Sequence, residues 1–475
     1  MQTDAAPESS GLPATFFVLS GAAAIVAGAS IPGAPPGINF AATGALVLAA
    51  VLAARRKALA NSDHVLIAIG TVLLIFSAVR SATWVLTLDL VCFVVIVSVA
   101  TARSRGWAEV SMSAPRTFRT LPRGTAFVVG PATKKAAHDV RLTPVLRTVT
   151  MMALAVAVFG GLFASADPAF ASLADDFLVP SLDLSLLPAR AATAIGVVAV
   201  AGSLTLQSVE SEATAGPNYS ERRIKLGGAE WKATLVLIDL LFAGFVAVQL
   251  AVLFGGHDHV LGTTGLTYAE YARQGFFQLM AASVLTLGVI AAAVMVPRTG
   301  RADRAWLRVL LGILCLLTLV ILASASKRMN LYQEAYGFSR LRLLADLAIL
   351  LLGGTFLLLL VAGTMWKGAW LPRAIVILGA ATVIGFNLYN PDARIAQKNV
   401  RRFFRTAQID LDYLAGLSPD AVPELMALPE PERHCVRVRR GARRLRAEMA
   451  VNYAIVELTT ISGSARRVPL RTSAG

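Results

Sequence analysis

Long apolar runs, each bounded by charged residues or by proline and glycine, recur along the chain. Eleven such runs fall at 14–31, 38–54, 64–79, 83–101, 148–166, 189–206, 233–254, 276–296, 307–326, 343–362 and 371–389. A helix needs about 20 mostly apolar residues to cross a hydrocarbon core. The runs lack the apolar–polar alternation that is typical of membrane barrels. The pattern therefore predicts an all-α, polytopic transmembrane helical bundle of eleven spans.

Composition agrees with this prediction and excludes a soluble protein. Apolar residues make up 56% of the 475-residue chain, charged residues make up 15%, and the mean hydropathy is +0.65. A soluble domain carries about 25% charged residues. So much apolar surface is covered by lipid more readily than by the chain's own core. The three cysteines, of which Cys92 and Cys315 lie within runs, indicate no disulfide framework.

The distribution of lysine and arginine predicts which side each loop occupies. The net charge is +15, and one set of alternate loops holds 22 basic residues against seven on the other. Basic loops stay in the cytoplasm, so the N-terminus is expected there and an odd number of spans leaves the tail outside. The tail is itself basic, but long segments cross membranes largely regardless of charge. We therefore expect a cell-membrane protein, in the bacterial inner or plasma membrane.

The longest basic loop, 102–147, is predicted to be cytoplasmic and to lie along anionic lipid head groups, because it combines nine basic residues with few acids. Its four prolines argue against one continuous helix. Since the spans already explain where the bases fall, we expect the lipid bilayer as a partner and no nucleic acid. The sequence leaves protein partners unknown.

Two regions are predicted. Residues 1–390 form the transmembrane helical domain, and residues 391–475 form a small, mainly helical, extracytoplasmic tail. Within the tail, apolar spacing predicts a helix over 392–417. Ser418 followed by Pro419 is a typical helix start, and it predicts a short helix to Leu428. A basic helix is predicted over 433–457.

Two predicted outer loops are dense in tyrosine, glutamate and arginine at helical spacing. These candidate residues are Tyr268, Glu270, Tyr271, Arg273, Arg328, Tyr332, Glu334, Tyr336 and Arg340. Arginine forks bind carboxylate or phosphate groups, so the two loops could line one pocket at the outer surface. Tyrosine is also typical of the membrane interface, where arginine and glutamate can simply join helix ends. Both interpretations stay open.

Three carboxylates fall inside or at the edge of predicted spans: Asp89, Asp239 and Asp346. A buried carboxylate in a membrane is costly and by default suggests function. Polar groups also serve as contacts between helices. For Asp89 we expect an ion pair with Arg80 or Arg328, for Asp239 the candidate partner is Lys232, and for Asp346 it is an outer-side arginine.

Several segments, in order and spacing, resemble the bacterial membrane family catalogued as domain of unknown function 4173. The resemblance runs from roughly Leu226 to Leu428. It is carried by Gly227-Gly228-Ala229-Glu230-Trp231, the 267–277 stretch Thr-Tyr-Ala-Glu-Tyr-Ala-Arg-Gln-Gly-Phe-Phe, the segment 328–337, Asn390-Pro391-Asp392, the segment 410–414, and the segment 417–423. The resemblance implies a polytopic architecture and brings no activity with it.

Familiar catalytic motifs are absent from the sequence. It has no phosphate-binding Gly-x4-Gly-Lys-Ser/Thr loop, no His-Glu-x-x-His and no Gly-x-Ser-x-Gly. Neither a metal nor a cofactor is predicted. Three functions stay open: a non-enzymatic cell-envelope protein for transport, sensing or scaffolding; a membrane enzyme acting on a lipid-linked or envelope substrate at the outer face; and an ion- or proton-coupled transporter. The missing motifs favour the first.

Overall fold

The computed structural model describes residues 12–34, 37–55, 60–102, 104, 106–138, 186–213, 228–254, 276–295, 301–365 and 368–441. The part of the chain that it describes is helical, without strands. The first half holds α1 (Ala14–Ser30), α2 (Ile38–Ala53), α3 (Asn61–Val79), α4 (Thr83–Thr101), α5 (Trp107–Arg119), α6 (Leu121–His138) and α10 (Leu187–Ala213). The second half holds α11 (Gly228–Phe254), α14 (Phe276–Met295), α15 (Arg301–Tyr336), α16 (Arg340–Met365) and α17 (Leu371–Tyr389).

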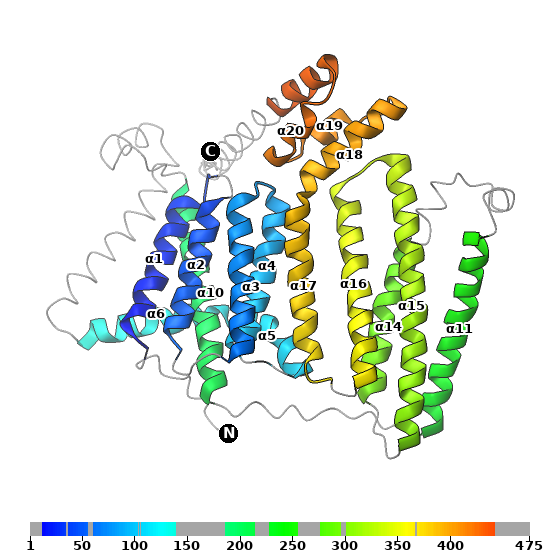
Figure 1. Cartoon of the computed structure of the whole chain (residues 1–475). Coiled ribbons are helices and arrows are strands. Elements are labelled where there is room, and N and C mark those ends of the chain that lie inside the picture. Colours follow the sequence, from blue (N-terminus) through cyan, green and yellow to red (C-terminus); the bar gives the residue numbers. More distant parts are fainter. Residues whose placement is uncertain are drawn as a thin grey trace, which may run out of the picture.

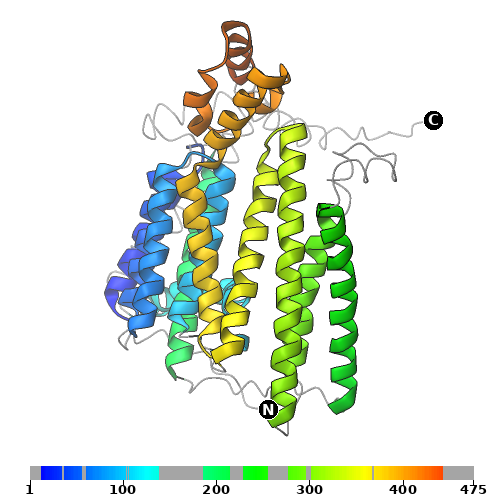
Figure 2. The same cartoon turned by 45° about the vertical axis from the view of Figure 1, so that its right-hand side comes forward.

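The long helices stand side by side in one bundle (Figure 1). On one side α1, α2, α3, α4 and α10 pack together, and on the other α15 contacts α11, α14 and α16. Helix α17 joins the two groups, because it contacts α3 and α4 as well as α16. Figure 2 shows the same row from another angle, with the C-terminal helices α18–α20 lying at one end of it.

Within the described ranges, eight helices are long and apolar enough to cross a membrane. Two more predicted spans are the shorter apolar helices α1 and α2. The predicted span 148–166 lies outside the described residues, so the count of eleven stays a prediction. Most of the other predicted runs match helices to within a few residues, but α10 continues to Ala213, beyond its predicted end at 206, and α15 is longer at both ends.

Helix α15 corrects the predicted outer loop 327–342. The helix continues past its apolar run to Tyr336, so that only residues 337–339 connect it to α16. The helix ends before Gly337, whose φ of 84° is a left-handed conformation that favours glycine. The N–H of Gly337 donates to the carbonyl of Gln333 at 2.8 Å. The polar residues in its last turns therefore project from a helix rather than from a loop.

The basic segment 102–147 contains two helices, α5 and α6, followed by residues that the structure does not describe. Helices α5 and α6 lie at the end of the bundle opposite α18–α20 (Figure 1). Helix α6 packs tightly on α10, because a Cβ added at Gly124 would lie only 2.5 Å from the backbone nitrogen of Ser203. The prediction that this segment is not one continuous helix fits the break at Thr120.

The C-terminal residues 391–441, here called the cap, contain α18 (Pro391–Thr406), α19 (Leu411–Ala415), the 3-10 turn η4 (Pro419–Ala421) and α20 (Val422–Leu425). Residues 430–441 are helical as well. The single helix predicted over 392–417 is therefore wrong. Ala407, at φ 55°, ends α18, and the side chain of Asp410 caps α19 by accepting from the N–H of Tyr413 at 2.8 Å. The helix start predicted at Ser418 is confirmed: Ser418 is the N-cap of η4, which continues directly into α20, although the helix ends at Leu425 and not at Leu428. Of the predicted helix 433–457, the part after residue 441 lies outside the described residues.

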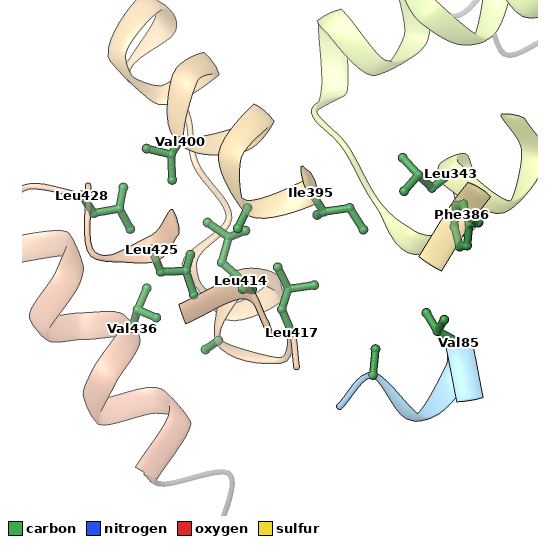
Figure 3. Close-up of a cluster of buried hydrophobic side chains, with 14 residues drawn as sticks. Val85, Leu343, Phe386, Ile395, Val400, Leu414, Leu417, Leu425, Leu428 and Val436 are labelled. Carbon is green, nitrogen blue, oxygen red and sulfur yellow. The ribbon is translucent and has the colours of Figure 1, made fainter. Parts of the chain in front are cut away.

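The cap shares its apolar core with the end of the bundle. Ile395, Val400, Leu414, Leu417, Leu425, Leu428 and Val436 of the cap belong to one buried cluster with Val85, Leu343 and Phe386 of the bundle (Figure 3). The Trp84 and Phe386 rings meet edge to face, with centroids 5.5 Å apart. Burial of apolar side chains therefore fixes the cap onto the ends of α4, α16 and α17.

Candidate functional site

The described residues form a dense polar network where the cap meets the bundle. We call Trp84, Arg340, Asp392, Tyr413 and Ser418 the joint. They come from α4, the start of α16, the start of α18, α19 and the residue before η4. Segments that are far apart in sequence thus converge at one point.

Asp392 is at the centre of the joint. It lies in the first turn of α18, directly after Pro391, and its side chain is fully buried. One carboxylate oxygen accepts from the indole N–H of Trp84 at 3.1 Å and from Nε of Arg340 at 3.0 Å. The other accepts from a terminal nitrogen of Arg340 at 2.5 Å and from the backbone N–H of Ser418 at 2.8 Å. A carboxylate has about four acceptor positions, and here four donors occupy them.

Arg340 is the cation that pairs with Asp392, and it also contacts other residues. Its guanidinium forms a two-pronged pair with the carboxylate, a geometry that arginine favours. The same group donates to the carbonyl of Gly416 at 3.3 Å and lies 5.9 Å from the centre of the Trp84 ring. Its backbone N–H donates to the hydroxyl of Tyr413 at 2.7 Å. Arg340 thereby ties the start of α16 to two parts of the cap.

The electrostatics of the joint favour the charged form of Asp392. Burial alone would raise the pKa of this carboxyl, but the hydrogen bonds and positive charge of Arg340, together with the Ser418 N–H, outweigh burial and lower it. Burial raises the pKa of the neighbouring Tyr413 hydroxyl. The joint thus holds an anion against a cation beside a neutral phenol.

Further contacts surround the joint and tie other loops to the cap. The backbone N–H of Ser81 donates to the Asp420 carboxylate at 3.1 Å. The Asn399 side chain brackets Phe338, accepting from its N–H at 3.0 Å and donating to its carbonyl at 2.9 Å. Arg402 donates to the carbonyl of Ala335 at 2.6 Å, which satisfies an acceptor at the C-terminal end of α15.

One layer deeper in the bundle, Asp89 has a different partner from the predicted arginine. The side-chain amide of Asn387, on α17, donates to Asp89 at 2.6 Å. Arg80 donates instead to the backbone carbonyl of Asn387 at 2.6 Å. Both Asp89 and Asn387 are buried. The expected ion pair is thus replaced by a hydrogen bond, because α17, rather than a basic loop, lies beside α4 at this depth.

The other two intramembrane carboxylates also differ from expectation. Asp346 accepts from the side-chain amide of Gln333 at 2.6 Å, where an arginine was expected. Lys232 pairs with Asp303 at 2.6 Å rather than with Asp239. Asp239 is buried, and neither of its carboxylate oxygens has a hydrogen-bond partner among the described residues.

The predicted outer cluster is described only in part. Tyr268, Glu270, Tyr271 and Arg273 lie outside the described residues, so their meeting with the other candidates stays a prediction. Arg328, Tyr332, Glu334 and Tyr336 lie on the last turns of α15. There the rings of Tyr332 and Tyr336 are 5.0 Å apart, and the guanidinium of Arg342 lies 4.3 Å from the centre of the Tyr332 ring. Of the candidates, Arg340 is the one that the structure places in the joint.

Sequence reasoning did not single out Trp84, Asp392, Tyr413 or Ser418 as site residues. A signal for three of them was present, because Asp392, Tyr413 and Ser418 fall within segments that carry the family resemblance. Trp84 gave no signal, since a tryptophan at the edge of an apolar run is typical of any membrane interface.

The geometry of the joint is that of a structural clamp. A general base needs a free lone pair within reach of a substrate proton. Both oxygens of Asp392 are occupied by donors from the chain itself. A buried carboxylate whose two oxygens are both hydrogen-bonded resists displacement, because moving its donors would leave part of its charge unpaired. The arrangement therefore holds two parts of the chain together.

Fold and site together define a multi-pass helical membrane protein with a cap clamped to one end of its bundle. The chain belongs to the family described as domain of unknown function 4153, whose model matches residues 19–428. No curated protein and no solved structure matches the chain.

The family match corrects the resemblance on two points. The family number is 4153, not the predicted 4173. The match also covers the first half of the chain, which the resemblance reached only as a set of apolar spans. It ends at Leu428, as the resemblance did, and so includes every residue of the joint.

We expect Asp392→Asn to loosen the cap. The change leaves Arg340 without its counter-charge and puts an amide donor where an acceptor is needed, a loss of about 2–3 kcal/mol for hydrogen bonds to a charged group. Thermal unfolding in detergent, with hydrogen exchange over α18–α20, measures this. Asp412→Asn, at an exposed carboxylate of the cap, is the matched control and should change little.

A comparison of the parent protein with Asp392→Asn also tests how stability depends on pH. Because the folded pKa of Asp392 is lowered, its stabilisation is complete above the unfolded value of about 4 and is lost as the pH falls from there through the folded pKa. The parent protein should lose melting temperature below about pH 4 more steeply than Asp392→Asn. Parallel curves for the two proteins would contradict the clamp.

Asp89 allows a second test. Asp89→Asn keeps an oxygen that can accept from Asn387, so the melting temperature should change little. Asp89→Leu removes that acceptor and should cost about 1–3 kcal/mol. If Asp89→Asn destabilises as much as Asp89→Leu, a charged partner is present and the hydrogen-bond assignment is wrong.

Proposed function

We propose that this chain is a non-enzymatic cell-envelope protein, a scaffold or sensor that holds a rigid cap on the outer side of the membrane. The observation that carries the proposal is the carboxylate of Asp392, whose acceptor positions are filled by Trp84, Arg340 and Ser418. A network saturated in this way supports a mechanical role better than a catalytic one. A membrane enzyme acting at the outer face remains the alternative, and it gains no support from Asp392, whose two oxygens are both hydrogen-bonded within the chain.

Charge and geometry together support a location for the cap. We infer that the N-terminus and the 102–147 segment face the cytoplasm and that the cap faces outside. The cap lies at the opposite end of the bundle from α5 and α6, which begin the segment with nine basic residues (Figure 1). Residues 1–390 then form the membrane domain and 391–475 the outer tail, joined through the apolar cluster described above.

A second candidate, an ion- or proton-coupled transporter, is favoured by one observation. Asp239 is buried on α11 with neither oxygen bonded by a described residue. Intramembrane carboxylates of this kind mark ion or proton pathways in transporters. The clamp at the joint weighs against it, since a moving gate needs contacts with two discrete arrangements.

The inferred topology predicts how the native cysteines react. Cys435 is exposed in the cap, whereas Cys315 is buried and Cys92 half-buried within helices of the bundle. A membrane-impermeant maleimide should therefore label this protein in intact cells, and Cys435→Ser should abolish the labelling of the protein. Labelling of Cys435 only after permeabilisation would place the cap in the cytoplasm.

A locking experiment separates a static scaffold from a gated transporter. Ser81→Cys and Asp420→Cys, in a Cys435→Ser background, put thiols on the two sides of a 3.1 Å contact between bundle and cap. A short bis-maleimide should bridge them in cells that depend on this copy of the gene. If the cap is static, the bridged protein complements a deletion of the chromosomal gene as well as either single-cysteine variant treated with the same reagent. Loss of complementation only on bridging would favour the transporter.

A further inference from the structure

Helix α5 exposes large apolar side chains and buries hydroxyl groups. A surface helix of a soluble protein turns apolar residues inward and polar residues outward. In α5 the buried side chains include Ser113 and Thr117, while Trp107 and Phe118 are 52% and 58% exposed. Met112 is exposed too. The outward face of α5 thus carries three large apolar side chains beside the exposed Ser111 and Arg119, which is more apolar surface than a water-facing helix needs.

The inward polar face of α5 is held by hydrogen bonds to the bundle. The hydroxyls of Thr117 and Ser98, on α4, lie 2.8 Å apart. From α10, Ser203 donates to the carbonyl of Thr117 at 2.7 Å and Gln207 donates to the carbonyl of Ser113 at 3.1 Å. These contacts fix which face of α5 points outward, so the exposure of its aromatic residues is set by the fold and is not a free rotation of the helix.

The position of α5 supplies the environment that this outward face fits. The helix follows α4 after a short connection and contacts the ends of α4, α10 and α17, at the opposite end of the bundle from the cap (Figure 1). Tryptophan is enriched where a membrane meets water. Two exposed bases, Arg119 and Arg123, stand four residues apart at the junction of α5 and α6. Apolar and aromatic residues beside basic ones are the pattern of interfacial helices that bind anionic lipids.

We propose that α5 lies in the membrane interface at the end of the bundle opposite the cap, with Trp107, Met112 and Phe118 against acyl chains and with Arg119 and Arg123 binding an anionic phospholipid head group. A soluble partner or a second copy of the chain would be the other occupants of this face. Lipid is favoured because the face is continuous with spans whose exposed residues are apolar. The proposal makes the general expectation for the 102–147 segment specific to named residues, and it does not depend on the cap or on its clamp.

Fluorescence quenching tests the apolar half of the proposal. The full chain is placed in lipid nanodiscs, and the contribution of Trp107 is the difference between the parent and Trp107→Phe. Phospholipids brominated on their acyl chains should quench that contribution, and aqueous iodide should not. Quenching by iodide alone would overturn the proposal, as would cross-linking of a photoreactive residue at Trp107 to a second copy instead of to lipid.

Lipid retention tests the charged half. Native mass spectrometry counts phosphatidylglycerol and phosphatidylcholine that stay bound to the purified chain. Each base near an anionic surface contributes about 1 kcal/mol, or about fivefold in affinity. Arg119→Gln with Arg123→Gln should therefore lower phosphatidylglycerol retention relative to phosphatidylcholine by about 25-fold.

The matched control removes the same charge from the cap. Arg401 and Arg405 are exposed on α18, and Arg401→Gln with Arg405→Gln should leave retention at the parent level. Equal losses in the two double variants would mean that only net charge matters, which would overturn a site at α5. Unchanged retention in Arg119→Gln with Arg123→Gln would overturn it as well. Melting temperatures in phosphatidylcholine confirm that both variants are folded.

Discussion

A buried, charged carboxylate is stable when hydrogen-bond donors fill its acceptor positions. At Asp392 this requirement determines how the cap is placed on the membrane bundle. Its four donors come from α4, from the start of α16 and from the turn before η4. If any one of these segments moved, at least one oxygen of the buried carboxylate would lose one of its two donors, which is costly in a medium of low dielectric constant. The cap is therefore fixed in orientation as well as in place.

Helix α17 carries this constraint into the membrane. It runs without a break to Tyr389, and Asn390 at φ 52° turns the chain into α18, so that Asp392 follows Asn387 by five residues. Asn387 bonds to Asp89 on α4, while Trp84, one and a half turns earlier on α4, bonds to Asp392. Helix α4 is thus joined to α17 at one depth and to α18, which follows α17 in the chain, at another. The cap and the adjoining end of the bundle are therefore held together by contacts at more than one level.

The polar groups of this protein fall into two kinds. At the joint, at Asp89 and at Asp346, side-chain donors of the chain itself bind the carboxylates, as expected of contacts that hold helices together. Asp239 lacks such a donor among the described residues. The first kind supports a scaffold or sensor, and the second keeps a transporter as the alternative. In helix α5 hydroxyl groups face the protein and two aromatic residues are exposed, on the face that we propose contacts lipid.

The sequence by itself determined the membrane-spanning architecture. Runs such as 83–101 and 371–389 match helices residue for residue, because hydrocarbon leaves a long apolar segment no other way to satisfy its backbone. That constraint is local, so it can be read from a single stretch of chain. The end of α15 was missed, since its last turns are polar and their helix is stabilised by contacts such as that of Arg402 with the carbonyl of Ala335.

Partners of charged groups were decided only by the tertiary structure. The sequence named Asp89 and Arg340 as important, but it assigned an arginine to Asp89 and left Asp392 without a role. Trp84 and Asp392 are 308 positions apart, and Asp89 and Asn387 are 298 apart. Which donor reaches a buried carboxylate depends on which helices pack side by side and at what height. Apolar runs fix that each helix spans the membrane, whereas its neighbours follow from side-chain packing over the whole bundle.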